Sequence, residues 1–353
     1  MATAVSTTDL LTLCAPLARV TGRSTPVGLV DSFGRIHHNL RISVTDRCNL
    51  RCTYCMPEEV VFRDKHELLS FEEIAHFVRV AAPMGINKVR LTGGEPLMRR
   101  DLHKLVRLVA AIPGITDVGL TTNGVLLADQ ARELYDAGLR RLNVSLDTLD
   151  PARFRELTRR DGLDAVLLGL AAANQVGFRP IKVNAISMRG STEHDAIPLA
   201  HFCRTHGYEL RFIEYMPIGA DAWEREKVYF AQEILDVLGR EISPLMESPN
   251  RDLRAPAMDY DYADGLGRVG IIASVSRPFC ASCNRLRLTA EGKLRNCLFS
   301  LDEVDVKGLL RAEDADGELA EAIRRTVWSK WEGHEINSAQ FVKPQRTMHA
   351  IGG

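Results

Sequence analysis

The 353-residue sequence contains no apolar run long enough to cross a membrane, and its formal net charge at pH 7 is only −1. We therefore expect no membrane-spanning helix and no general attraction to nucleic acid or to a membrane surface. The phosphate-cradling pattern Gly-x4-Gly-Lys-Ser/Thr is also absent. Side chains would have to hold the phosphates of a bound nucleotide. This mode of binding suits a nucleotide substrate better than a nucleotide that is hydrolysed to supply energy.

The size of the chain allows one large core or two domains, because 45% of its residues are hydrophobic and 26% are charged. Residues 1–29 are rich in Ser, Thr and Ala, and we expect a flexible leader there, with a transit peptide as the weaker alternative. The eight cysteines are mostly clustered, which favours metal binding in a reducing compartment over disulfides. We expect a cytoplasmic protein, or an organellar one if the leader is a transit peptide.

Short β-rich runs alternate with amphipathic helical patterns through the first two thirds of the chain. This rhythm predicts a parallel sheet with right-handed crossovers, either doubly wound or a complete or partial barrel. A capping box at Ser70 and Glu73 predicts one helix start. The predicted strands are Leu40–Thr45, Lys88–Thr92, Asp117–Thr121, Arg141–Ser145, Ile181–Ser187 and Leu210–Tyr215. The other predicted helices are Leu102–Ile112, Ala128–Ala137, Leu163–Gln175 and Ala196–Thr205.

The rhythm breaks after Arg240, so we place a boundary between residues 30–240 and residues 241–353. Glu241–Leu266 carries three prolines and many polar residues and is predicted to be a linker or meandering loop. A more β-like run from Val269 and a helix near Glu318–Trp331 are expected to follow.

Three cysteines, Cys48, Cys52 and Cys55, directly follow the first predicted strand. Three thiolates at this spacing can hold three irons of a [4Fe–4S] cube and leave the fourth iron open to a small molecule. A zinc site is the alternative, although zinc usually takes four ligands and no histidine lies close by in the sequence.

A second triad, Cys280, Cys283 and Cys297, lies in the C-terminal part. By itself this spacing fits zinc with a distant fourth ligand, but beside the first triad a second cluster is the stronger interpretation. Of the two other cysteines, Cys203 is predicted to be a buried apolar residue.

Basic residues occur within predicted strands, where apolar residues are expected. Buried Lys and Arg are seldom tolerated without a partner, so the set indicates a polyanionic ligand such as a triphosphate. The alternative is that several of them pair with Asp or Glu. The residues are Arg41, Lys88, Arg90, Lys182, Arg211, Arg285 and Arg287.

The Cys-x3-Cys-x2-Cys pattern with Tyr54 before the last cysteine resembles the radical S-adenosylmethionine (SAM) enzymes. The likeness extends to one branch, the GTP 3′,8-cyclase family of molybdenum cofactor biosynthesis, over roughly Val30 to Gly353. The segments that carry it are Asp31–Arg35, Leu40–Cys48, Arg90–Leu97, Cys283–Leu288 and the pair Gly352-Gly353.

The resemblance implies an α/β fold, a partial (βα)6 TIM-type barrel with a C-terminal auxiliary-cluster segment. It implies two [4Fe–4S] clusters and SAM as cofactors, with metal ligands Cys48, Cys52, Cys55, Cys280, Cys283 and Cys297. SAM contacts would be Tyr54, Gly94, Ser145 and Met216. GTP contacts would be Arg41, Arg90, Thr121, Lys182, Arg285, Leu286 and Arg287. Lys88 and Arg211 are less certain members of that set. The residues expected in catalysis are Arg285, Arg287, Gly352 and Gly353.

In that family a 5′-deoxyadenosyl radical removes the ribose 3′ hydrogen of GTP, and the product is (8S)-3′,8-cyclo-7,8-dihydroguanosine 5′-triphosphate. The expected partners are an external electron donor, a downstream cyclic pyranopterin monophosphate synthase and a second copy of the chain in a homodimer. Two rival interpretations stay open here. One is a radical SAM peptide-modifying enzyme with an auxiliary cluster, and the other is a non-catalytic metal-binding regulatory protein.

Overall fold

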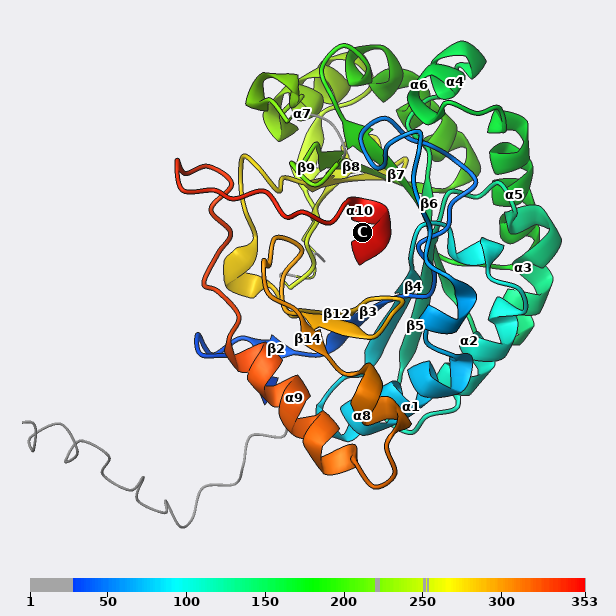
Figure 1. The fold of residues 1–353 in the computed structure, drawn as a ribbon. Coiled ribbons are helices and arrows are strands. Elements are labelled where there is room, and N and C mark those ends of the chain that lie inside the picture. Colours follow the sequence, from blue (N-terminus) through cyan, green and yellow to red (C-terminus); the bar gives the residue numbers. More distant parts are fainter. Residues whose placement is uncertain (1–27, 220–222, 250–251, 253, 353) are drawn as a thin grey trace, which may run out of the picture.

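The computed structural model describes residues 28–219, 223–249, 252 and 254–352, and its centre is one strongly curved sheet (Figure 1). Twelve strands form the sheet, in the order β14-β13-β12-β3-β4-β5-β6-β7-β8-β11-β10-β9. A separate two-stranded sheet pairs β1 (Leu29–Val30) with β2 (Ile36–His37). The predicted leader, residues 1–29, falls almost wholly outside the described residues.

Six neighbouring parallel strands make up the predicted barrel segment. They are β3 (Asn39–Ser43), β4 (Lys88–Thr92), β5 (Asp117–Thr122), β6 (Arg141–Ser145), β7 (Ile181–Ser187) and β8 (Glu209–Glu214). Each agrees with its predicted range to within two residues at either end. The partial α/β barrel is therefore confirmed.

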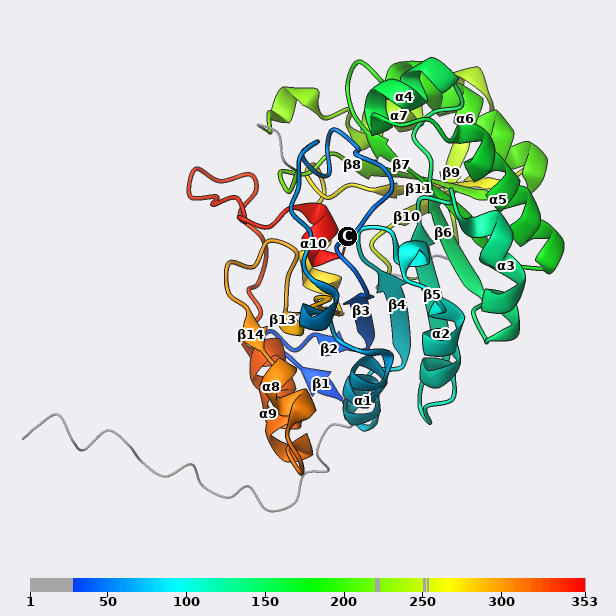
Figure 2. The ribbon, with the colours of Figure 1, turned by 45° about the vertical axis from the view of Figure 1, so that its right-hand side comes forward.

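Helices cover the outer face of this curved sheet, as Figures 1 and 2 both show. The α-helices are α1 (Phe71–Ala81), α2 (Leu102–Ala110), α3 (Leu127–Asp136), α4 (Pro151–Thr158), α5 (Leu163–Val176), α6 (Thr192–His206) and α7 (Ala231–Glu241). Short 3-10 turns lie at Lys65–Glu67, Ala82–Met84, Pro96–Met98, Arg225–Lys227 and Cys280–Ser282. The predicted capping box is present, because Ser70 Oγ accepts from the Glu73 amide while the Glu73 carboxylate accepts from the Ser70 amide.

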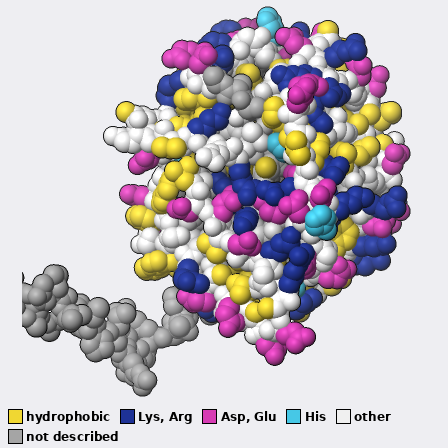
Figure 3. Space-filling view, viewed as in Figure 1, with side chains coloured by type: hydrophobic (Ala, Val, Ile, Leu, Met, Phe, Trp, Pro, Cys, Tyr) yellow, Lys and Arg dark blue, Asp and Glu magenta, His cyan; other side chains and the backbone are white. Residues whose placement is uncertain are grey.

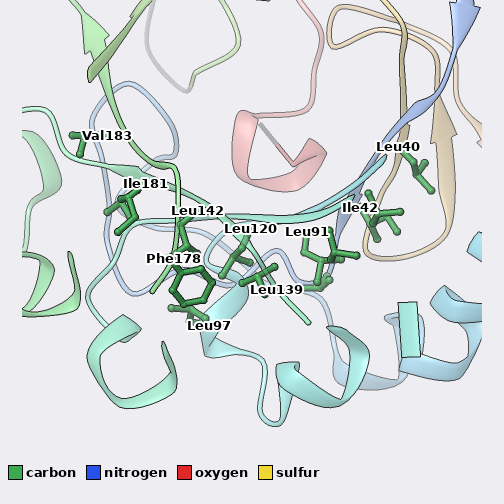
Figure 4. Close-up of a cluster of buried hydrophobic side chains, with 14 of the residues drawn as sticks. Leu40, Ile42, Leu91, Leu97, Leu120, Leu139, Leu142, Phe178, Ile181 and Val183 are labelled. Atoms are coloured by element: carbon green, nitrogen blue, oxygen red, sulfur yellow. The ribbon is translucent and has the colours of Figure 1, made fainter. Parts of the chain in front are cut away.

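Side chains alternate between the two faces of the sheet, and this separates the core from the site. Apolar residues such as Leu40, Ile42 and Leu91 are fully buried among the residues shown in Figure 4, between strands and helices. Their strand neighbours Arg41 and Arg90 point to the opposite face, because successive side chains in a strand alternate. A parallel strand with one charged face is unusual, so the interior of the barrel is chemically distinct from the helix-covered side.

The segment after residue 240 extends the same sheet at both ends. At one end β11 (Arg268–Ile272) pairs in parallel with β8, and β10 (Met258–Tyr262) and β9 (Leu245–Glu247) continue outward. The prediction of a linker or meandering loop over Glu241–Leu266 was therefore wrong in part. The three prolines led to the prediction of a loop, but the segment contains two short antiparallel strands. Proline is tolerated at strand ends and edges, so its presence did not exclude them.

At the other end β12 (Arg285–Leu288) pairs in parallel with β3. The strands β13 (Lys293–Arg295) and β14 (Val304–Asp305) follow it antiparallel. Because one sheet runs across the predicted boundary, the division at residue 240 stays a prediction. The remaining helices are α8 (Lys307–Arg311), α9 (Asp316–Trp328) and α10 (Met348–Ile351). In the described part of the chain, no helix has the length and apolarity to cross a membrane.

Candidate active site

The first cysteine triad lies in the loop that leaves the carboxyl end of β3. Its three thiols are unpaired and lie close enough to influence one another electrostatically. Burial raises the pKa of Cys48 to about 11 and that of Cys55 to about 12, and it raises the pKa of Cys52 well above its ordinary value. Metal ligation requires the deprotonated thiolate, so these buried thiols need a bound cation to ionise. A cationic cluster fits this donor set.

The segment Gly93–Pro96 packs directly against the backbone that leads into this loop. A Cβ at Gly93 would lie 2.4 Å from the carbonyl oxygen of Thr45, and one at Gly94 would lie 2.4 Å from that of Arg47. The Gly94 amide donates to the Thr45 carbonyl at 2.8 Å. The paired glycines thus allow two backbone segments to make contact. This contact supports the cysteine loop, whether or not Gly94 also contacts a ligand.

Glu95 fixes the same region from a fully buried position. Its carboxylate accepts from Thr122 Oγ1 at 2.7 Å, from the Asn123 amide at 2.6 Å and from the Leu97 amide at 2.9 Å. Burial outweighs these hydrogen bonds and raises the pKa of Glu95 to about 7. Asn123 in turn directs its side-chain amide at Cys48 Sγ, 3.8 Å away.

Tyr54 is held by a partner that the sequence analysis did not single out. Its hydroxyl donates to Asp147 Oδ2 at 2.6 Å, and Asp147 Oδ1 accepts from the Ile186 amide at 2.8 Å. Tyr54, Asp147 and Ser145 line a cavity of about 30 Å³ beside Cys52. Met216 packs with Tyr54 in a small apolar cluster. Three of the four proposed SAM contacts, Tyr54, Ser145 and Met216, therefore lie near the first triad at the carboxyl ends of the strands.

The second triad lies at the opposite end of the barrel interior. β12 runs parallel to β3 and beside it, but Cys283 precedes β12 whereas the first triad follows β3. Cys297 lies beyond β13, which runs antiparallel to β12 and so returns toward Cys283. The three thiols are unpaired and again influence one another electrostatically.

Two cations converge on Cys283. Arg285 directs Nε and Nη2 at Cys283 Sγ, each at 3.4 Å, and Lys330 Nζ lies at the same distance. Burial would raise the pKa of Cys283, but these cations outweigh it and lower the pKa to about 6. Burial raises the pKa of Cys280, and the nearby charge of Arg285 offsets that rise only in part. Within the described residues, no group of three His, Cys, Asp or Glu side chains is arranged to hold a single metal ion.

A row of arginines crosses the barrel interior between the two triads. The strand register places Arg287 beside Arg41 and Arg41 beside Arg90. Within the described residues, neither Arg41 nor Arg90 has an ion-pair partner, and Arg41 Nε and Arg90 Nη1 are buried without a hydrogen bond. Gly119 lies beside Arg90 in the register, and a Cβ there would lie 3.8 Å from that guanidinium, an ordinary contact distance.

Burial and neighbouring positive charges lower the pKa values of the arginines in this row. Burial lowers the pKa of Arg90 to about 10, with further lowering from Arg141 and Arg211. Burial and then Arg285 lower the pKa of Arg287 to about 9, and the pKa of Arg41 also falls well below its ordinary value. Like charges held together in a buried place disfavour their charged forms. A bound polyanion would reverse that penalty.

Not all of the predicted cations are free. Lys182 Nζ lies 2.5 Å from Glu209 Oε2, and Arg211 Nη2 lies 3.6 Å from Asp259 Oδ1. For these two residues the ion-pair alternative holds in the structure. Lys88 lies one step from Arg90 on the same face, and Thr121 shares a register row with Lys182.

Leu286 lies on the other face of its strand, fully buried in the hydrophobic core beside Leu40. Its side chain therefore does not face the arginine row. Only its backbone could contact a nucleotide there.

The C-terminal segment enters the barrel, as Figures 1 and 2 show for α10. The His349 amide donates to the Cys55 sulfur, and Arg287 Nη1 donates to the Gly352 carbonyl at 2.5 Å. Ile351 packs in the apolar cluster of Tyr54 and Met216. The tail therefore spans from the first triad to the arginine row. Gly353 lies outside the described residues.

Basic and acidic side chains lie side by side across the middle of the face seen in Figure 3. Ion pairs also hold the C-terminal tail. Arg346 pairs with Glu291 and with Glu303, whose Oε2 accepts from Arg346 Nη2 at 2.7 Å, and Glu303 also pairs with Arg295. Arg346 through these ion pairs, and His349 through its amide hydrogen bond to Cys55, anchor the tail.

Comparison with known proteins identifies the family. Residues 42–203 match the model of the radical SAM superfamily, and residues 208–336 match that of the Molybdenum Cofactor Synthesis C domain. A protein of Rhodopirellula baltica named GTP 3′,8-cyclase is 46% identical over 338 residues, 94% of each chain. One of the same name from Mycolicibacterium smegmatis is 48% identical over 332 residues, 92% of each chain. The chain belongs to the GTP 3′,8-cyclase family.

The fold of this family member also resembles Streptococcus suis SuiB, solved bound to S-adenosylmethionine. The TM-score is 0.59 at 15% identity, over 88% of this chain and 76% of SuiB. At that identity the likeness concerns the fold alone. Membership of the radical SAM superfamily carries the use of SAM and of iron–sulfur chemistry.

Proposed function

We propose that this chain converts GTP into (8S)-3′,8-cyclo-7,8-dihydroguanosine 5′-triphosphate, the first step of molybdenum cofactor biosynthesis. One observation carries the proposal beyond the family match. Arg41 and Arg90, within the described residues, have no ion-pair partner, although both face an interior flanked by two cysteine triads. A protein without a polyanionic ligand would gain nothing from keeping these charges buried.

Two [4Fe–4S] clusters would fit the two sets of unpaired thiols, one held by Cys48, Cys52 and Cys55 and the other by Cys280, Cys283 and Cys297. When bound, the first cluster would supply the electron for reductive cleavage of SAM, and the second would provide an iron that can bind the guanine. The positions of the triads at opposite ends of β3 and β12 support this division. The number of clusters is part of the proposal.

The protein's own residues position the substrate and exclude water. Arg41, Arg90 and Arg287 would hold the triphosphate through charge-assisted hydrogen bonds. Arg285, stacked on Phe279 with 4.6 Å between guanidinium carbon and ring centre, is held next to Cys283. Because Lys182 and Arg211 have carboxylate partners, a phosphate would have to compete with Glu209 or Asp259 for them.

Tyr54, Gly94, Ser145 and Met216 would contact SAM at the other end. Asp147 fixes the Tyr54 ring through a 2.6 Å hydrogen bond, and the glycine pair places the Glu95 loop against the first triad. The tail closes the space between SAM and GTP, with Gly352 against Arg287. A terminus that ends in glycine adds no side chain to that crowded space.

The rival activities differ in what the arginine row would bind. A peptide-modifying radical SAM enzyme needs a groove for an extended chain, and a regulatory metal protein needs no buried arginines. Relatives at 46–48% identity that are named GTP 3′,8-cyclase also favour the cyclase. We further propose an external one-electron donor, a downstream cyclic pyranopterin monophosphate synthase, a homodimer and a cytoplasmic location, where clustered thiols stay reduced.

The test is an anaerobic incubation of the iron-loaded protein with SAM, dithionite and GTP. We expect one equivalent of 5′-deoxyadenosine for each cyclised nucleotide, identified by mass spectrometry. ATP in place of GTP serves as the control for base recognition. Release of 5′-deoxyadenosine without any cyclised guanine nucleotide would contradict the proposal.

A further inference from the structure

Lys330 lies in the turn after α9 and has a buried side chain, 4% exposed. Its ammonium donates to Cys283 Sγ at 3.4 Å and to the backbone carbonyl oxygen of Arg285 at 2.9 Å. Within the described residues, Lys330 has no carboxylate partner. A buried ammonium needs an anionic partner, and the sulfur of Cys283 is the group placed to supply it.

The distribution of charged donors over the six triad cysteines is uneven. Cys283 receives hydrogen bonds from both Lys330 and Arg285. The other hydrogen bonds to triad sulfurs that the structure shows come from neutral groups. The Leu50 amide and the Asn123 side chain donate to Cys48, the His349 amide donates to Cys55, and the His334 amide donates to Cys280. The second triad is therefore the one with positive charge fixed at a sulfur.

We propose that Lys330 is a positioning residue that favours the reduced form of the iron–sulfur cluster held by the second triad. Hydrogen bonds to the sulfur ligands and nearby charge set the potential of such clusters. Reduction adds one electron, supplied by an external one-electron donor, and a fixed ammonium stabilises the added negative charge. The inference rests on the proposed second cluster.

The role differs from that of Arg285, which also faces the nucleotide site. Lys330 reaches Cys283 from α9, outside the barrel strands, and its second hydrogen bond fixes the backbone of Arg285. It can therefore act on the cluster and keep Arg285 in place without touching GTP.

The experiment compares wild type with K330M, K330R and K307M in the full, anaerobically reconstituted protein. Lys307 is the matched control, because its ammonium also donates to a backbone carbonyl, that of Glu67 at 2.6 Å, but to no cysteine. Potentials are measured by EPR-monitored titration. The signal of the second cluster is the one lost in C280S/C283S/C297S.

In K330M we expect the ratio of reduced to oxidised second cluster at a given potential to fall about tenfold, a shift of the midpoint potential by about 59 mV to a more negative value. K330R should stay near wild type, K307M should not move, and the first cluster should be unaffected in all three. If K330M retains no second cluster, K330Q takes its place, and a more negative potential in K330Q is the supporting result.

An unchanged potential in K330M or K330Q, with iron for two clusters still bound, would overturn the inference. A fall in melting temperature without a shift in potential would then assign Lys330 to capping the Arg285 carbonyl. Wild-type protein with iron only at the first triad would overturn the proposed second cluster itself, and iron analysis separates that outcome from the other two.

Discussion

Arg287 Nη1 donates a 2.5 Å hydrogen bond to the carbonyl oxygen of Gly352, a residue 65 positions later in the sequence. Arg287 stands in the same register row as Arg41, which faces the proposed triphosphate site. The tail is therefore attached to the residues that we expect to hold the substrate. This contact predicts that the position of the tail and the binding of the substrate depend on each other.

Gly352→Ala should impair cyclisation strongly while iron content stays at the wild-type level. Gly352 has φ 79°, and a Cβ there would lie 2.9 Å from Thr92 Cγ2 and 3.0 Å from Ser43 Cβ. The left-handed backbone alone costs roughly 1–2 kcal/mol for an L-residue. Gly317→Ala is the control, because nothing lies within 4 Å of its added Cβ. Deletion of Gly352 and Gly353 should act in the same way as Gly352→Ala, and normal turnover of both would contradict a role for the tail.

Arg287→Ala should weaken GTP binding far more than SAM binding. Loss of one charge-assisted phosphate contact costs on the order of 1.5–3 kcal/mol, or roughly 10- to 150-fold in Kd. Calorimetric titration with GTP and with SAM measures both affinities, and Arg285→Ala should behave alike. The exposed Arg324, paired with Glu321 at 3.3 Å, provides the control variant Arg324→Ala. An equal loss of both affinities would indicate a folding defect instead.

Serine at Cys48, Cys52 or Cys55 should abolish release of 5′-deoxyadenosine, since the first triad is proposed to serve SAM. Serine at Cys280, Cys283 or Cys297 should spare part of that release and abolish cyclisation. Chromatographic assay of both products, with iron and zinc analysis of anaerobic protein, checks the division. Zinc in place of iron at the second triad would refute the two-cluster account.

Arg346→Ala should release the tail from its ion network and lower cyclisation about tenfold, with a smaller effect on thermal stability. Arg346 is 20% exposed and its partner Glu303 is 18% exposed, so the pair is partly screened and contributes about 1 kcal/mol. A double-mutant cycle of Arg346→Ala with Glu303→Gln should give a coupling of that order. Additive effects on turnover would mean that the network does not position the tail.

The stability of the fold should fall with rising pH in a way that depends on Glu95. Burial raises the pKa of Glu95 from 4.5 to about 7, so its contribution is fully present below about pH 4.5 and is lost as pH rises through about 7. The change amounts to about 3 kcal/mol at most. Chemical denaturation of wild type and Glu95→Gln over pH 4.5–7.5 should show a difference that shrinks by this amount. If the free energies of unfolding of the two proteins differ by the same amount at every pH, Glu95 does not titrate in this range.

The barrel strands and the cysteine triads were predictable because their signals are local. Short β-rich runs located β4, β6 and β7 with their observed bounds, and thiol spacing located both triads. The strands β9 and β10 were missed because they are held by strand pairing, β10 with β11 and β9 with β10, which no local pattern records. The ion pairs of Lys182 and Arg211 were also hidden, since their partners Glu209 and Asp259 stand on other strands.

Two residues of the site had no usable signal at all. Lys330 lies two residues after the exposed Trp328, at the polar end of a helix, yet its ammonium reaches Cys283, 47 positions earlier. Asp147 carries no recognisable motif, and its hydrogen bond with Tyr54 depends on how two loops meet. Contacts of this kind are set by the tertiary fold rather than by sequence spacing.

The central claim is tested most directly with GTP deuterated at the ribose 3′ position. After one anaerobic turnover with SAM and dithionite, we predict one deuterium in the released 5′-deoxyadenosine and a cyclised guanine nucleotide that has lost it. Mass spectrometry of both products decides the question. Unlabelled 5′-deoxyadenosine beside a cyclised product, or labelled 5′-deoxyadenosine without one, would contradict the account.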